Sequence, residues 1–170
     1  MNTMRRWLVL FLAVVLAAAV CLLPLPRPIH VTHAALAWRC GDDAYSETTD
    51  ITINGTYFDY LLKEDFFDGA ITASGFPETQ RPLPRVTFHD SMGFLFYQGE
   101  TGLLESTFGW IIMPPDGSAC VIGVHEEHGW SGDTGLMISA PAGSRQEAAA
   151  LANRLYRQYS PDFLGNWVLE

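Results

Sequence analysis

Residues 107–124 read TFGWIIMPPDGSACVIGV and give the clearest indication of the fold class. Large apolar side chains alternate with smaller residues over 107–113, which predicts a half-buried strand. The Pro-Pro-Asp-Gly segment at 114–117 predicts a turn, because proline presets φ and glycine tolerates positive φ. The apolar run 119–124 predicts the returning strand. Two strands joined this closely are antiparallel neighbours in a sheet.

Short apolar runs between turn residues continue upstream and downstream of this hairpin. Asn54-Gly55 follows alternating isoleucines and predicts a second tight hairpin. Ser144 and Glu147 have the spacing of a capping box, which predicts a helix that ends before Pro161. Further strands are expected at 58–62, 69–74, 86–89, 94–97 and 136–139. We therefore expect an α+β, β-rich fold, a mainly antiparallel sandwich or half-barrel of about seven or eight short strands with one C-terminal helix packed on it.

The N-terminus predicts export. Arg5 and Arg6 precede an apolar run at 7–23. A basic start followed by such a run directs a chain into or across a membrane, and the arginines place everything beyond the run outside the cytoplasm. The prolines after residue 23 favour an uncleaved single-pass anchor in the cell membrane, whereas the alanines at 17–19 fit cleavage of a signal and secretion.

The prolines that follow the apolar run suggest a spacer. Pro24, Pro26 and Pro28 favour an extended chain. Residues 24–37 are therefore expected to form a stalk, and residues 38–170 a single extracytoplasmic β-rich domain.

The domain is strongly acidic. The chain has 10 basic and 19 acidic residues, for a net charge of −9. Arg5, Arg6 and Arg27 precede residue 38, so the domain keeps 7 basic and all 19 acidic residues, for a net charge of −12. This charge excludes nucleic acid as a partner. It would attract a basic protein.

Cys40 and Cys120 are the two cysteines of the expected domain, whereas Cys21 lies in the apolar run. In an oxidising compartment such a pair is expected to form a disulfide. The alternative is two separate thiols, because the sequence does not show that they meet.

Residues 125–128 contain the best candidate for a chemical site. His125, Glu127 and His128 are side chains that zinc accepts, with Glu126 or Glu127 as a base and His89 as a further ligand. The glycines that follow favour a loop, so a solvated polar loop without any cofactor is the alternative. The chain lacks the glycine-framed nucleophile and phosphate-binding motifs of common enzymes.

Two aromatic residues fall in expected loops. Phe76 lies beside prolines and Trp130 between glycines. Because aromatic side chains anchor interfaces, both are candidates for a partner surface. We expect a non-enzymatic binding domain of the cell envelope, whose partner is a basic protein or a wall component. The alternatives are a metal-binding or metal-dependent hydrolase domain and an inhibitory module that fills a basic cleft.

Overall fold

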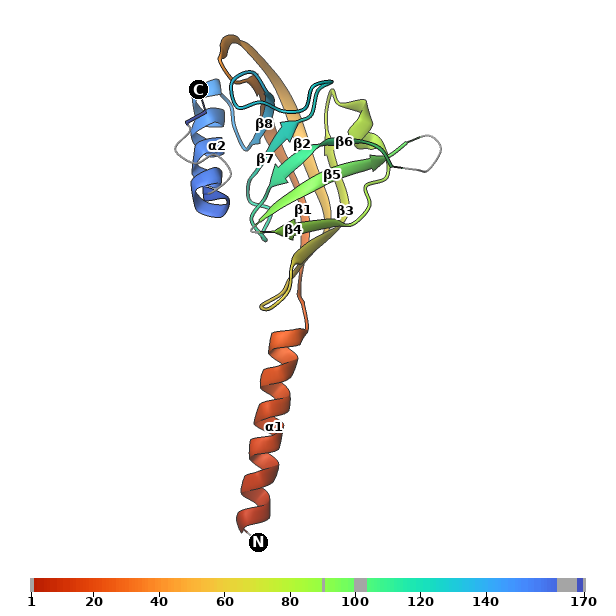
Figure 1. The fold of residues 1–170 in the computed structure, drawn as a ribbon, viewed down its shortest axis with the longest axis vertical. Helices are drawn as coiled ribbons and strands as arrows, with labels where there is room; N and C mark the ends of the chain where they lie inside the picture. Colours follow the sequence, from red (N-terminus) through yellow and green to blue (C-terminus); the bar gives the residue numbers. More distant parts are fainter. Residues whose placement is uncertain (1, 90, 100–103, 162–167, 170) are drawn as a thin grey trace.

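The computed structural model describes residues 2–89, 91–99, 104–161 and 168–169. A long N-terminal helix leads into an eight-stranded barrel, and a second helix lies on the outer face of the barrel (Figure 1). The elements in chain order are α1 (Asn2–Leu22), β1 (Leu25–Arg39), β2 (Asp42–Asp59), β3 (Asp65–Ala73), the 3-10 turn η1 (Pro77–Gln80), β4 (Val86–His89), β5 (Met92–Gln98), β6 (Leu104–Ile112), β7 (Cys120–Val124), β8 (Leu136–Ala140) and α2 (Arg145–Tyr159).

The barrel is an antiparallel meander. Each strand pairs with the next one in the chain, and β8 pairs with β1 to close the sheet. The hairpin predicted from residues 107–124 is confirmed as β6 and β7, paired from Gly109↔Val124 to Ile112↔Val121. The predicted antiparallel sheet and C-terminal helix are also confirmed. Closure on β1 replaces the expected sandwich or half-barrel.

The stalk expected at 24–37 is wrong, because residues 25–39 form the first strand of the barrel. β1 pairs with β2 from Leu25↔Asp59 to Arg39↔Asp42, with a bulge after Trp38. Its two prolines lie where β1 has a neighbour on one side only, since β8 pairs only with residues 36–39. Proline is tolerated at such an edge because one ladder hydrogen bond is not required there.

The hairpin expected at Asn54-Gly55 is also wrong. β2 runs through both residues without a break, and the chain turns at 60–64 instead. Gly55 lies opposite Gly69 in β3, and a Cβ on Gly55 would come within 2.7 Å of both the Gly69 Cα and the Phe67 ring. Glycine is needed here for close approach of two strands beneath an aromatic ring.

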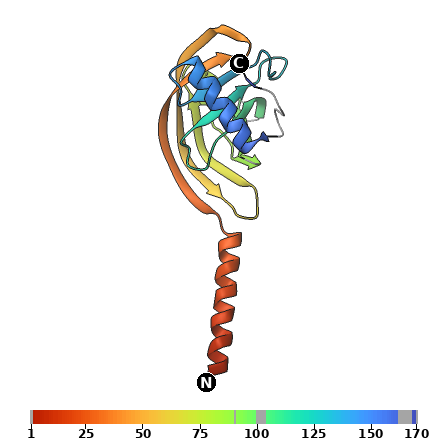
Figure 2. The ribbon, with the colours of Figure 1, turned by 90° about the vertical axis from the view of Figure 1, so that its left-hand side faces the viewer.

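The core has two layers. The larger layer fills the barrel with the inward-facing side chains of all eight strands, Tyr57, Phe67, Phe88, Leu95 and Ile111 among them. The smaller layer lies between the outer face of the barrel and α2, which crosses β6, β7, β8 and β1 (Figure 2). Its largest members are Trp38, Trp110 and Tyr156. An eight-stranded barrel is just wide enough for side chains to fill it, so the interior is a packed core.

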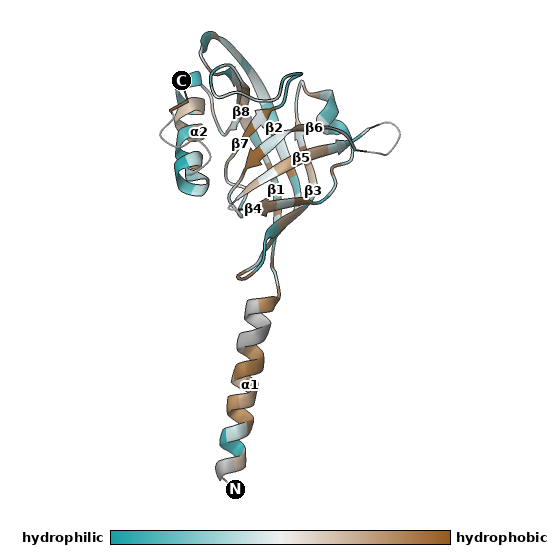
Figure 3. Cartoon of the chain, in the orientation of Figure 1, coloured by the Kyte–Doolittle hydropathy of each residue, from teal (hydrophilic) through white to brown (hydrophobic). Residues whose placement is uncertain are grey.

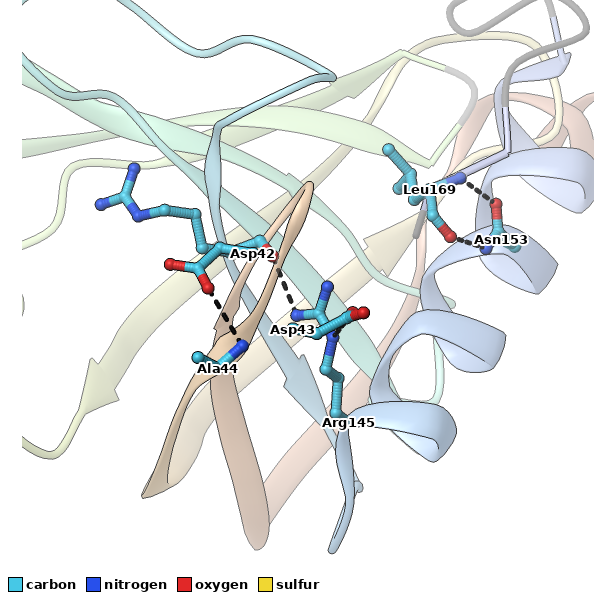
Figure 4. Close-up of polar contacts among 7 residues, drawn as sticks. Asp42, Asp43, Ala44, Arg145, Asn153 and Leu169 are labelled. Atoms are coloured by element: carbon cyan, nitrogen blue, oxygen red, sulfur yellow. Dashed lines mark hydrogen bonds and ion pairs between the residues drawn. The ribbon is translucent and has the colours of Figure 1, made fainter.

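The N-cap predicted for α2 at Ser144 is confirmed, whereas the Glu147 side chain bonds the residue before the cap and not the cap itself. The Ser144 Oγ accepts a hydrogen bond from the Glu147 N–H (3.3 Å), and the Gly143 N–H donates to the Glu147 carboxylate (2.9 Å). Arg145 then ties the start of α2 to the β1–β2 turn through Asp43 (3.0 Å) and the Arg39 carbonyl (2.8 Å) (Figure 4). These contacts fix α2 against the barrel.

The expected disulfide is absent, since Cys40 and Cys120 are buried free thiols. Cys120 belongs to the barrel interior and Cys40 to the layer under α2. Burial raises the pKa of the Cys40 thiol to about 11 and that of the Cys120 thiol to about 12.

Helix α1 projects away from the barrel (Figure 3), and its large apolar side chains between Trp7 and Leu16 are exposed. Trp7 is 67% exposed and Leu16 is 67% exposed. No helix within the described parts of the chain meets both the length and the apolarity that a membrane crossing requires.

Candidate functional site

A pocket of about 230 Å³ lies at one end of the barrel. Its apolar walls come from the inner faces of β5, β6 and β7, through Tyr97, Phe108 and Val124, and from Phe76 on the segment before η1. Phe108 packs edge-on against both Tyr97 and Phe76, with ring centroids 5.6 Å and 5.9 Å apart. The η1 segment, the 125–134 loop and the β1–β2 turn surround this end, which is the one farthest from α1 (Figure 1). We call the hollow the distal pocket.

The wall formed by Phe76 is held by a buried hydroxyl. The Thr79 Oγ1 accepts a hydrogen bond from the Ala73 N–H (2.9 Å) and lies 2.7 Å from the Phe76 carbonyl, to which it can donate. Thr79 is 2% exposed, and it joins η1 to the end of β3. This anchor gives a segment rich in proline one conformation, and it thereby fixes the position of Phe76.

Polar side chains form the rim of the distal pocket. They are Glu78 and Arg81 from the η1 segment, Thr107 at the end of β6, and His125 directly after β7. The His125 N–H donates to the Phe108 carbonyl (2.8 Å), which extends the β6–β7 pairing by one residue and places the imidazole at the mouth. The pocket therefore combines an apolar floor with an ionisable rim.

The loop that follows His125 is clamped to the barrel. Arg39 donates from both terminal nitrogens to the two oxygens of Glu126, at 2.8 Å and 2.7 Å, and also to the Thr134 carbonyl at 2.8 Å. The guanidinium lowers the pKa of Glu126, and the carboxylate raises the pKa of Arg39. Gly41 adds a backbone contact: it has a φ of +69° and approaches Asp133 so closely that a side chain would not fit.

The predicted metal ligands do not form a cluster. His125 lines the distal pocket, Glu126 is bound by Arg39, and Glu127 and His128 point into solvent on the far side of the turn closed by Gly129. Within the parts of the chain that the structure describes, no three His, Cys, Asp or Glu side chains are close enough to share a metal ion. We therefore derive no metal chemistry from this loop.

His89 lies at the opposite end of the barrel. Its Nδ1 is 3.5 Å from the Glu64 carboxylate, beside a wide hollow of about 590 Å³ that also contacts Ser91 and the β2–β3 turn. His89 and His125 therefore serve no common site. Asp90, the middle residue of the His-Asp-Ser run, lies outside the described residues.

The two aromatic candidates have different surroundings. Phe76 is half-buried and forms part of the distal pocket. Trp130 is half-buried outside the barrel, where it packs edge-on against Trp110 with ring centroids 5.1 Å apart. Phe76 thus lies where a partner side chain could reach it, whereas Trp130 mainly extends the layer under α2.

Glu78 is the acidic residue in the lining of the distal pocket. Further exposed acidic residues belong to the first part of β2 and to the 125–134 loop: Asp42, Asp43, Glu47, Glu127 and Asp133. Arg39 and Arg145, which lie at the same end, are already engaged by Glu126 and Asp43. Arg81 adds a positive charge on the rim beside Glu78, so the acidic residues of this end lie mainly on β2 and the 125–134 loop and not in the pocket lining.

Sequence reasoning identified His125 and Phe76 but missed Tyr97, Phe108 and Thr79. Tyr97 and Phe108 follow the alternation of strand residues, so nothing in the sequence separates a pocket wall from a core position. Thr79 belongs to no motif that would identify it in the sequence. No protein family, curated protein or solved structure matches the chain.

Proposed function

We propose that the chain is a non-enzymatic binding module of the cell envelope, held at the membrane by its N-terminal segment. Its partner is a basic protein segment that places one apolar side chain in the distal pocket. The observation that carries the proposal is an apolar pocket at the end of the barrel farthest from α1, with Glu78, Arg81 and His125 in its polar lining and further exposed acidic residues on the adjoining loop.

The size of the pocket favours a side chain over a free small molecule. Pockets for drug-sized ligands have volumes of roughly 300–1,000 Å³, whereas the distal pocket has about 230 Å³. A single aromatic or branched aliphatic side chain fits such a space. Protein interfaces are commonly anchored in this way, by one residue buried in a preformed pocket and surrounded by weaker polar contacts.

The charge around the pocket favours a basic partner. Glu78, Glu127 and Asp133 are exposed at its rim or on the adjoining loop. A cluster of one sign steers an oppositely charged partner and raises its association rate. Glu78 and the acidic residues of the adjoining loop would provide this attraction, and the apolar pocket would select the residue that enters it.

The envelope location rests on the N-terminus. Arg5 and Arg6 before the apolar run 7–23 support export. The acidic domain would then lie outside the cytoplasm, where basic secreted or wall-associated proteins are available as partners.

Peptide binding tests the proposal with the full chain in detergent. The probes are short lysine-rich peptides that differ only in one central residue, Trp, Leu or Ser, and fluorescence anisotropy reports their affinities. We expect the Trp or Leu peptide to bind at least about tenfold more tightly than the Ser peptide, equivalent to roughly 1.4 kcal/mol. A matched set with Glu in place of Lys should not bind.

Two variants separate the pocket from the charge. Thr107→Trp fills the distal pocket from its rim and should remove the preference for Trp over Ser while leaving the net charge unchanged. Glu127→Gln with Asp133→Asn should weaken all three lysine peptides equally and leave the preference intact. Equal affinities of the three peptides for the natural chain, or an unchanged preference in Thr107→Trp, would contradict the proposal.

A further inference from the structure

The geometry points to a second contact surface, at the opposite end of the barrel: the β2–β3 turn is a lipid-contacting tip that rests on the bilayer beside the end of α1. We define the proximal tip as Leu61, Leu62 and Lys63. The inference rests on the proposed membrane attachment, and it adds a contact between the folded barrel and the lipid.

The pairing of β1 with β2 places the proximal tip beside α1. Helix α1 ends at Leu22, and β1 begins only three residues later at Leu25. Leu25 is the Cα partner of Asp59, the last residue of β2 before the turn. The end of α1 and the β2–β3 turn therefore lie next to each other, because one leads into β1 and the other follows the β2 residues that pair with the start of β1. Both ribbon views show the turn at the level of the upper end of α1 (Figures 1 and 2).

The large apolar side chains at this end face solvent. Leu61 is 68% exposed and Leu62 is 67% exposed, and on the connection from α1 Leu23 is 62% and Leu25 is 58% exposed. The hydropathy colouring shows brown at the tip of the turn, beside hydrophilic positions (Figure 3). Exposed apolar side chains gathered at one place mark a candidate contact surface.

The neighbouring side chains suit the surface of a bilayer. The Lys63 Nζ lies 5.7 Å from the centre of the Tyr60 ring. Tyrosine and lysine are residues that reach between hydrocarbon and headgroups. The Arg27 guanidinium pairs with the Asp59 carboxylate at 2.8 Å. Glu64, which follows the tip, lies 3.5 Å from the His89 Nδ1.

Lipid fits this surface better than a protein partner does. The apolar side chains of α1 between Trp7 and Leu16 are exposed, which favours one apolar medium around that part of the helix. A medium that extends to Leu22 and Leu23 would also reach the tip, because β1, which starts at Leu25, pairs with the end of β2. A separate protein would have to cover the tip and leave the adjacent helix to the lipid.

Site-specific fluorescence tests the contact in the full chain. The chain carries Cys21→Ser and one added cysteine, either Leu62→Cys at the tip or Glu127→Cys at the distal end as the matched control. Cys40 and Cys120 are buried, so the added thiol takes the label. An NBD label is read in phosphatidylcholine vesicles with and without spin-labelled lipid, and then with iodide. Flotation of the vesicles reports attachment of the chain in the same samples.

We expect the label at position 62 to shift to the blue, to lose intensity with spin-labelled lipid and to be protected from iodide. The label at position 127 should behave in the opposite way. A third chain, labelled at Lys63→Cys and carrying Leu61→Ser and Leu62→Ser, should still float but should lose the quenching by lipid.

Flotation separates the failure of the tip contact from the failure of the attachment. A chain that does not float overturns both. A floating chain whose position 62 label is open to iodide, or protected from both quenchers, overturns the lipid contact alone. The contact is also overturned if quenching persists after both leucines are replaced by serine.

Discussion

Cys40 and Cys120 lie on opposite faces of the same barrel wall. Cys120 packs inside the barrel, and Cys40 packs outside it under α2. Cys120 is the partner of Ala140 in β8, whereas the neighbour of Cys40, Arg39, pairs with Leu136 at the other end of that strand. Four residues along a strand correspond to roughly 13 Å, which is far beyond the Cα separation that a disulfide allows.

The first prediction concerns these two thiols. In a Cys21→Ser chain, neither Cys40 nor Cys120 should react with a thiol reagent at neutral pH until the protein is unfolded, because burial raises the pKa of Cys40 to about 11 and that of Cys120 to about 12. Absorbance after addition of Ellman's reagent, with and without denaturant, measures this. Detection of a peptide that links Cys40 to Cys120 after non-reducing digestion would refute the arrangement.

The second prediction concerns the paired glycines of β2 and β3. Gly55→Ala should lower the free energy of unfolding by roughly 1–3 kcal/mol, the usual cost of forcing extra atoms into a packed site, because its Cβ would lie 2.7 Å from the Gly69 Cα. Gly143→Ala is the control, since its Cβ would meet only the Glu147 carboxylate at 3.5 Å. Urea unfolding followed by tryptophan fluorescence compares them, and equal midpoints would contradict the close approach.

The third prediction concerns a buried hydrogen bond between the barrel wall and the layer under α2. The Trp38 Nε1–H donates to the Ser139 Oγ at 3.0 Å, and both residues are fully buried. Ser139→Ala should cost roughly 1–3 kcal/mol of unfolding free energy, because it leaves the indole N–H without its acceptor. The loss should be smaller when Ser139→Ala is made in a Trp38→Phe chain, where no donor is left unpaired. A double-mutant cycle with no coupling would argue against the bond.

The fourth prediction is a pH dependence at the clamp of the 125–134 loop. Arg39 lowers the pKa of Glu126 in the folded protein below its ordinary value of 4.5. The pair therefore contributes stability above that value, and the contribution is lost as pH falls through the lowered pKa. Because Glu126 is 45% exposed, solvent screening limits the effect to about 1 kcal/mol or less.

The test of this clamp is acid-dependent urea unfolding. Glu126→Gln should remove one component of the stability loss between neutral pH and acid pH, whereas Glu127→Gln, on an exposed neighbour, should not. Identical pH profiles for the natural chain and Glu126→Gln would show that the clamp contributes nothing in solution.

Local patterns predicted the parts of the fold that depend on neighbouring residues. The turn at 114–117 and the helix N-cap at Ser144 were predicted correctly because their residues act within a few positions. The closure of the barrel was missed because it depends on pairing of residues 36–39 with 136–139, about a hundred positions away. The hairpin prediction at Asn54-Gly55 failed for a related reason. The glycine is there for a cross-strand contact with Gly69, which the sequence does not show, whereas the same dipeptide is common in turns.

The site was only partly predictable for the same physical reason. His125 was predicted as a site residue because it is a possible metal ligand directly after a predicted strand. The distal pocket itself exists because Thr79 holds the η1 segment over the ends of β5 and β6, and a lone threonine among prolines gives no signal in the sequence.

The connection between α1 and β1 is short, so the length of β1 determines how far the distal pocket lies from α1. Only Leu23 and Pro24 separate the helix from a strand of 15 residues that runs to the distal end. That strand can span up to about 50 Å at the usual rise per residue. So short a connection leaves little freedom between α1 and the barrel. In the membrane attachment that we propose, the length of β1 would therefore set the distance from the bilayer at which a partner meets the distal pocket.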